Sequence, residues 1–215
     1  PPPVPAPVTV VVMAGDHGVH AQGVSPWPQE VTVQMVANVA AGGAVINALA
    51  RQVGAAVEVV DVGVAAPLLF TDGVVQRRVR SGTRDFTRES ALTRDEVARA
   101  LAVGVALADE RVDGGDRMRV TGDLGIGNTT ASAALVAVFT GSDPADVTGA
   151  GAGSAAEMVA HKVAVIRAGL ERHTPDPADP IGVLASFGGL EHAALAGLLL
   201  GAAAQRIPVV LDGVI

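Results

Sequence analysis

Cysteine is absent from the 215 residues. Its absence excludes disulfide bridges, zinc sites built from thiolates and a cysteine nucleophile, and it is consistent with the reducing cytoplasm, where we expect the protein to act. Aromatic side chains are rare as well, at 2% of the residues. The core must therefore be built from Ala, Val, Leu and Ile, whose small side chains let helices lie close to a sheet.

Basic clusters and long apolar runs are also missing. The net charge is -7, and binding along a nucleic-acid backbone requires clustered Lys and Arg, so we predict no nucleic-acid partner. The longest apolar stretch, residues 193–204, is shorter than the roughly 20 residues that cross a bilayer. No charged segment followed by an apolar one opens the chain, so we predict neither a signal peptide nor a membrane partner.

The residues that are present favour a large core, since 49% are hydrophobic and 17% are charged. We predict one α/β domain over residues 1–215. Predicted strands lie at residues 8–13, 57–62, 117–121 and 207–211, and predicted helices at residues 28–51, 93–107, 129–138 and 189–204, with another helix around Lys162. This alternation predicts a parallel sheet covered by helices on both faces. Ligands of such sheets bind beyond the carboxyl ends of the strands.

The glycine-rich segment 122–130 follows one predicted strand and opens a predicted helix. Gly125 and Gly127 let the backbone approach an anion, and the helix that follows offers free N–H groups. Asn128 can cap that helix and also reach a ligand. The segment lacks the lysine of a Walker loop and the spacing of a dinucleotide loop. An ordinary tight turn remains the alternative.

A second glycine loop, residues 149–154, precedes the helix that carries Lys162. Gly151 and Gly153 belong to this loop and could contribute backbone donors to an anion. A lysine in such a helix often faces solvent, which is the alternative interpretation. Taken together, the two loops and the lysine predict a phosphate or phosphoribosyl site.

Acidic side chains stand at or near the ends of several predicted strands. Asp16 and His17 follow the first strand, but no further histidine or carboxylate lies at ligand spacing around them, so we predict no metal. Asp61, Asp123 and Asp212 follow the same pattern, and each could simply cap a turn. If they converged on one edge, they could hold ribose hydroxyls and stabilise an oxocarbenium-like ribosyl group.

An arginine-rich segment, residues 77–88, interrupts this pattern. Its arginines alternate with Asp and Gly. The composition is typical of a solvated surface segment, and no functional role follows from it.

Ten short motifs together resemble one family, the nicotinate-nucleotide–dimethylbenzimidazole phosphoribosyltransferases. They occur in the family's order over nearly the whole chain, and the pairing of Gly-Asp-His-Gly with Gly-Ile-Gly-Asn-Thr-Thr is highly specific. The motifs begin at Ala14, Gly23, Glu30, Gln34, Gly42, Val60, Gly82, Gly125, Gly188 and Val210.

The resemblance implies a Rossmann-like sheet, usually in a homodimer, and no cofactor. It implies transfer of phosphoribose from nicotinate mononucleotide to a benzimidazole base in cobalamin biosynthesis, with inversion at the anomeric carbon. By motif position, the mononucleotide would be held by Gly125, Gly127, Asn128, Gly151, Gly153, Lys162 and Asp212. Ser25 and Gln34 would line the benzimidazole pocket.

Two departures from the family pattern concern catalysis. Asp123 stands where many members have glutamate, and it is the one candidate catalytic residue in the chain. The family's catalytic base, a glutamate in a Gly-Glu-Gly motif, has no counterpart here, and most of the family's small helical domain is also missing. We therefore expect a partial chain of a transferase. A non-catalytic nucleotide-binding module is the alternative, whereas a dinucleotide-dependent oxidoreductase is disfavoured because no GxGxxG motif follows a strand.

Overall fold

The fold is known from a computed structural model that describes residues 6–68, 72–151 and 155–212. Its centre is a parallel sheet with the strand order β3-β2-β1-β4-β5. The strands are β1 (Val8–Gly15), β2 (Ala56–Gly63), β3 (Val74–Gln76), β4 (Met118–Leu124) and β5 (Val209–Val210). β1 occupies the middle because it is apolar on both faces, as a strand with a neighbour on each side and helices above and below requires.

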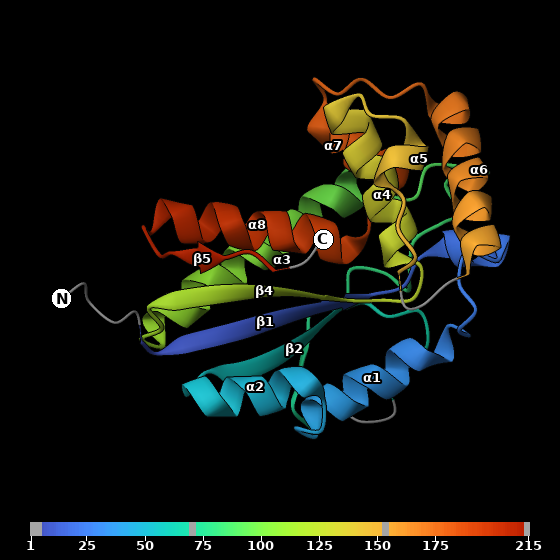
Figure 1. Cartoon of the computed structure of the whole chain (residues 1–215). Helices are drawn as coiled ribbons and strands as arrows, with labels where there is room; N and C mark the ends of the chain where they lie inside the picture. Colours follow the sequence, from blue (N-terminus) through green and yellow to red (C-terminus); the bar gives the residue numbers. More distant parts are fainter. Residues whose placement is uncertain (1–5, 69–71, 152–154, 213–215) are drawn as a thin grey trace.

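Helices cover both faces of this sheet, as predicted (Figure 1). One face packs against α1 (Glu30–Ala40) and α2 (Val45–Val53), and the other packs against α3 (Arg94–Asp113) and α8 (Leu190–Ala204). The alternation of side chains along β1 explains the two cores. Val10 and Val12 belong to the cluster under α1 and α2, whereas Val11 and Met13 belong to the cluster under α8.

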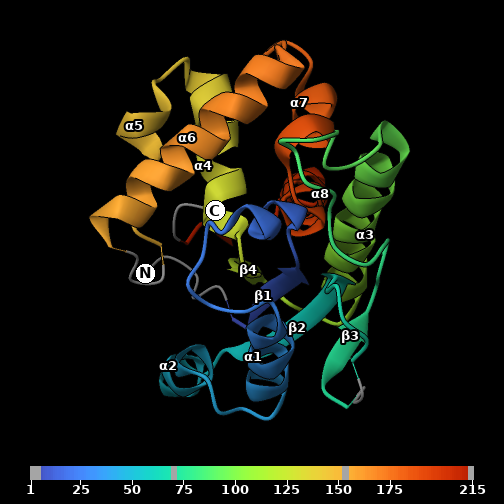
Figure 2. The same cartoon turned by 90° about the vertical axis from the view of Figure 1, so that its right-hand side faces the viewer.

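A further group of helices lies beyond the carboxyl ends of the strands (Figures 1 and 2). It consists of the 3-10 helix η1 (Gly18–Gln22) and the α-helices α4 (Asn128–Thr140), α5 (Pro144–Val147), α6 (Ala156–His173) and α7 (Pro180–Phe187). These helices surround the edge of the sheet at which parallel α/β folds bind ligands.

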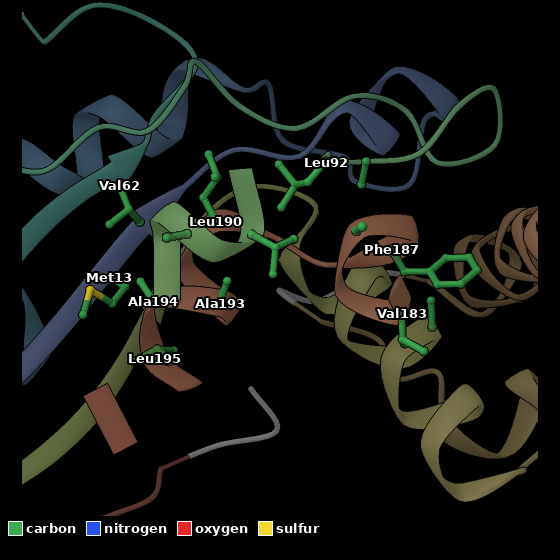
Figure 3. Packing of buried hydrophobic residues seen from close by; sticks show 14 of the residues in the cluster. Met13, Val62, Leu92, Val183, Phe187, Leu190, Ala193, Ala194 and Leu195 are labelled. Atoms are coloured by element: carbon green, nitrogen blue, oxygen red, sulfur yellow. The ribbon is translucent and has the colours of Figure 1, made fainter. Parts of the chain in front are cut away.

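The helix group and the sheet share one apolar cluster (Figure 3). Leu190 and Ala194 on α8 pack near Met13 of the sheet, while Phe187 at the end of α7 continues the same cluster. Phe187 meets Phe86 edge to face, with 5.6 Å between the ring centroids. This continuity fixes α8 relative to both the sheet and the outer helices.

The predicted elements are present, but η1, α5 and α7 were not predicted, and several strands differ from the prediction. β4 continues to Leu124, through the first residues of the predicted glycine loop, because these residues pair in register with β1. β5 spans two residues instead of five, and the short strand β3 was not predicted. α3 begins with a capping box, since Thr93 N donates to the Glu96 carboxylate and Glu96 N donates to Thr93 Oγ1 at 3.1 Å.

One segment, Glu30–Val53, is long and apolar enough to cross a membrane by length and composition. In the structure it forms two helices separated at Gly42 and Gly43, and Val36, Val39 and Ala50 are buried. The segment covers the sheet, so its apolar face has a structural explanation.

The arginine-rich segment is a network of ion pairs. Four of its five arginine side chains are a quarter to two fifths exposed, and each of the five has an acidic partner. The pairs are Arg77 with Glu110, Arg78 with Asp61, Arg80 and Arg84 with Glu96, and Arg88 with Asp85. The segment therefore ties the loop after β3 to α3 and to the end of β2.

Candidate functional site

A small cavity of about 100 Å³ lies at the amino-terminal end of α4. Its wall combines the glycine loop after β4 with the loop before α1 and with one side chain of α6. The lining residues are Val24, Ser25, Pro26, Gly125, Ile126, Gly127, Asn128, Thr129 and Lys162. The structure thus brings the predicted first glycine loop, the predicted lysine and Ser25 together.

The structure explains why glycine occupies positions 125 and 127 of the first loop. A Cβ on Gly125 would overlap the carbonyl oxygen of Gly15, so the loop lies directly on the end of β1. Gly127 caps α4 with a φ of 97°, a conformation that favours glycine. The first N–H groups of α4 are already engaged, by the carbonyl oxygens of Gly125 and Gly127 and by Asn128 Oδ1. The helix therefore offers the cavity the positive end of its dipole, which favours an anion.

Lys162 is the only lysine in the sequence, and its side chain is directed inward. The residue is 3% exposed, and its Nζ lies 3.5 Å from the carbonyl oxygen of Ala150. Burial lowers the pKa of this ammonium group. The prediction that it shares a site with the second glycine loop has geometric support, because a Cβ on Gly151 would lie 3.0 Å from both Lys162 Nζ and Thr129 Oγ1. Gly153 lies outside the described residues.

A larger hollow of about 310 Å³ begins at the adjacent residue, Leu124, on the side of α1 and α2. Met35, Thr121, Asp123 and Asp212 also line it. Asp212 is exposed, and its backbone N–H donates to Thr121 Oγ1 at 3.3 Å. Leu124 in the wall of this hollow and Gly125 in the wall of the smaller cavity are adjacent in the chain.

Two predicted site residues do not reach these cavities. Gln34 lies exposed on α1, because the helical period turns Thr32 and Val36 inward and Gln34 outward. Its neighbour Met35 lines the larger hollow instead. Asp61 is fully buried and engaged by Arg78 at 2.8 Å and by the N–H of Val64 at 2.9 Å. The suggested convergence of three aspartates therefore reduces to Asp123 and Asp212.

Behind Asp123 lies a buried cluster that the sequence did not predict. His17, after β1, forms an ion pair with Glu191 of α8, with 2.8 Å between Nε2 and Oε1. His192 Nδ1 lies 3.2 Å from the same carboxylate oxygen, and its Nε2 lies 3.9 Å from Asp123 Oδ2. More than 170 residues separate His17 from Glu191, so spacing gave no signal; the only hint was the Gly188-Gly189 motif with Glu191.

The protonation states of this cluster follow from burial and charge. Burial lowers the pKa of His17, but the charge of Glu191 and the hydrogen bond to it outweigh burial and raise that pKa. Burial opposes ionisation of Glu191 as well, but the charge of His17 lowers its pKa to about 2. Burial, followed by the charge of Glu191, raises the pKa of Asp123 to about 8, and burial lowers the pKa of His192 to about 4.

The neighbourhood of His17 bears on the prediction of no metal. That prediction relied on the lack of further ligands near His17 in the sequence, and this premise is wrong for the folded chain. His17, Glu191 and His192 offer ligand atoms within 4.8 Å of one another. However, His192 Nδ1 already accepts the N–H of Gly189 at 2.8 Å, and His17 is already paired with Glu191. A metal-free site stays our prediction.

The fold and the cavities define an α/β protein with a candidate small-ligand site near the carboxyl edge of a parallel sheet. A model of the family described as phosphoribosyltransferase matches residues 1–215. The chain belongs to the nicotinate-nucleotide–dimethylbenzimidazole phosphoribosyltransferase family.

Relatives with this name agree over most of the chain. The protein from Salinispora tropica is 59% identical over 229 residues, which cover 100% of this chain and 63% of the relative. The protein from Geobacter sp. is 52% identical over 206 residues, which cover 96% of this chain and 59% of the relative. A crystal structure of CobT from Thermus thermophilus superposes with a TM-score of 0.93 at 42% identity, covering 98% of this chain and 63% of that one.

The fraction of each relative that is covered limits how much of the whole protein the similarity describes. The chain spans about three fifths of the length of the relatives that it matches. The Rossmann-like parallel sheet with helices on both faces is confirmed.

Proposed function

We propose that the protein transfers phosphoribose from nicotinate mononucleotide to 5,6-dimethylbenzimidazole in cobalamin biosynthesis. The bond between the anomeric carbon and the nicotinate nitrogen breaks, and a bond from the same carbon to a benzimidazole nitrogen forms on the opposite face. Nicotinate leaves, and the attacking base releases its proton. The products are nicotinate, α-ribazole phosphate and a proton.

The observation that carries this proposal is that Lys162 and the amino-terminal end of α4 line one small cavity, with Gly151 against Lys162 and Thr129. An ammonium group and the positive end of a helix dipole suit a single phosphate without a metal or another cofactor. Gly125, Gly127 and Asn128 form the loop beside this cavity, and Gly153 would add a donor. Asp212, at the adjoining hollow, would lie by the ribose.

The larger hollow suits the aromatic base. Much of its wall is apolar, with Met35, Val39 and Ile46 among its residues. Ser25 lies in the wall of the smaller cavity and would contact an edge of the base. Flat aromatic ligands are typically held in this way, by apolar walls with a few polar groups that fix their orientation.

The proton of the attacking base needs an acceptor. No Gly-Glu-Gly sequence occurs among the 215 residues, so the main catalytic base is not among the residues of this chain. Asp123 is its one candidate for catalysis. We further propose that the active protein is a cytoplasmic homodimer and that the described residues belong to one α/β domain.

The direct test is turnover by the full-length protein. Nicotinate release from nicotinate mononucleotide is measured with dimethylbenzimidazole present and a chelator in the buffer. We expect release that depends on the base and continues in chelator. A folded full-length protein that releases no nicotinate would overturn the transferase proposal.

One alternative function is a nucleotide-binding module without catalysis. The same assay separates the two functions, because the module would bind the mononucleotide in calorimetry and leave it intact. A full-length protein with both binding and turnover would reject the module.

Substitution of Lys162 tests whether this residue binds the mononucleotide and not the benzimidazole base. We expect Lys162→Ala to weaken binding of nicotinate mononucleotide roughly tenfold to a hundredfold, because a charge-assisted contact to phosphate is lost. Binding of dimethylbenzimidazole should change little. Calorimetry with each ligand measures both effects, and an equal loss for the two ligands would contradict the assignment of Lys162 to the phosphate.

A further inference from the structure

His192 caps the helix on which it lies. It is the third residue of α8, and its Nδ1 accepts the backbone N–H of Gly189, the residue before the helix, at 2.8 Å. A nitrogen that accepts a hydrogen bond carries no proton, so the cap fixes the tautomer with the proton on Nε2. Protonation of the ring would break this cap, because both ring nitrogens would then be donors.

The opposite side of the ring faces α4 and Asp123. Nε2 lies 2.9 Å from Ser132 Oγ, and Ser132 Oγ donates in turn to the carbonyl oxygen of Asn128 at 2.9 Å. The Nε2–H of His192 is therefore engaged by Ser132. Asp123 Oδ2 lies farther from it, at 3.9 Å.

Asp123 consequently lacks a cation of its own. Its side chain is 4% exposed, and Oδ2 has no hydrogen-bond partner among the described residues, whereas Oδ1 accepts from the amide of Asn128. The groups that act on it are His17 after β1, Glu191 and His192 on α8, and the uncharged Asn128 on α4. Asp16 lies near His17 and Glu191, and Ser132 bonds His192. The one cationic ring, His17, is directly paired with Glu191 at 2.8 Å.

We propose that His192 is a positioning residue: its neutral ring shields Asp123 from water and keeps that side chain as an uncharged carboxylic acid beside the glycine loop. Two buried carboxyl groups lie on the two sides of one neutral imidazole, and only Glu191 has a cation. A carboxyl group without a cation or water stays protonated, as its raised pKa also indicates. An uncharged acid beside the glycine loop has an O–H that it can donate to an oxygen of a ligand bound there, such as a ribose hydroxyl.

The identity of that ligand rests on the proposed function, but the protonation of Asp123 does not. Infrared spectroscopy of the ligand-free chain tests it, because the C=O stretch of a carboxylic acid is distinct from that of a carboxylate. We expect an acid band at pH 7 that Asp123→Asn removes and that disappears in the unsubstituted chain only as the pH rises through about 8. If no such band exists at pH 7, the proposal is overturned, whatever the turnover assay gives.

The role of His192 is tested with His192→Asn. Asn47, the third residue of α2, already caps that helix by accepting the N–H of Ala44 at 3.0 Å, so asparagine can preserve the cap of α8 while it removes the ring beside Asp123. We expect native-like unfolding together with an acid band whose midpoint falls by about one pH unit or more, because water enters. An unchanged midpoint would overturn the positioning role.

A measurement on the unsubstituted chain covers the case in which this variant does not fold. Nitrogen-15 NMR of histidine should show His192 neutral at pH 7, with the proton on Nε2. A protonated His192 ring at pH 7 would overturn the proposal, because it would supply the cation that Asp123 is inferred to lack.

Discussion

At the scale of single residues, burial and the ionised carboxylate of Glu191 both oppose ionisation of Asp123, while the amide of Asn128 favours it. The folded chain therefore holds a proton on Asp123 up to about pH 8, whereas an unfolded aspartate loses its proton near pH 3.9. Between these two values the folded state binds one proton more than the unfolded state, so the contribution of Asp123 to the free energy of unfolding falls as the pH rises.

Asp123→Asn makes this dependence measurable. Asparagine does not titrate, and its Oδ1 can keep accepting from Asn128. We expect the stability of the variant relative to the unsubstituted chain to increase steadily from pH 4 to 8 and to level off above pH 8. Urea unfolding across this range gives the difference in the free energy of unfolding. A difference that stays constant from pH 5 to 8 would show that Asp123 is ionised in the folded chain.

The residues also show which parts of the site a sequence can predict. Gly125, Gly127 and Lys162 carry local signals, a glycine loop before a helix and a lone cation, and they line one cavity. Gln34 lies on the exposed face of α1 and lines neither cavity, so its assignment to the benzimidazole pocket stays a prediction. Glu191 and His192 were missed because their chemistry depends on His17, which the fold of the chain brings to them.

At the scale of elements, α8 positions the buried cluster, and its closeness to α3 depends on glycine. A Cβ on Gly104 of α3 would overlap the carbonyl oxygen of Ala194, and a Cβ on Gly197 of α8 would overlap that of Leu101. The two backbones thus approach each other at both points. The sequence indicated this only indirectly, through its small residues.

Gly104→Ala tests the contact. Helix propensity alone would make this substitution stabilising by about 1 kcal/mol. We expect the opposite sign, a loss of roughly 1–3 kcal/mol, because the added methyl group forces the helices apart. Ala102→Gly, at an exposed position of the same helix, is the matched control and should cost about 1 kcal/mol. Stabilisation by Gly104→Ala in urea unfolding would contradict the packing.

Strand pairing explains why the glycine loop begins later than predicted, after Leu124 instead of at Gly122. Gly122, Asp123 and Leu124 read as a polar turn, but they extend β4 beside β1, where Asp123 pairs with Met13. Tertiary pairing overrides the low strand propensity of glycine and aspartate. This extension points the Asp123 side chain toward α8, on the same face of the sheet as Met13.

At the scale of the whole molecule, two cavities of different chemistry lie along β4 and the glycine loop that follows it. The smaller one holds Lys162 and the first turn of α4, and the larger one is mostly apolar and ends at Asp212. The order of the strands was not predictable, because hydrophobic periodicity indicates where strands and helices lie but not which strands pair with each other. The parallel class was predictable, because strands and helices alternate along the chain.

The proposed function assigns Lys162 to the phosphate of nicotinate mononucleotide, and NMR of the chain with carbon-13-labelled lysine is the decisive experiment for this assignment. With one lysine in the sequence, the ammonium-bearing carbon gives one signal, and its titration reports the pKa that burial lowers. Saturating nicotinate mononucleotide, and to a lesser degree inorganic phosphate, should move that titration to higher pH, because an adjacent anion favours the charged form. Dimethylbenzimidazole alone should leave it in place. A lysine titration that stays unchanged while calorimetry shows the mononucleotide bound would contradict the assignment.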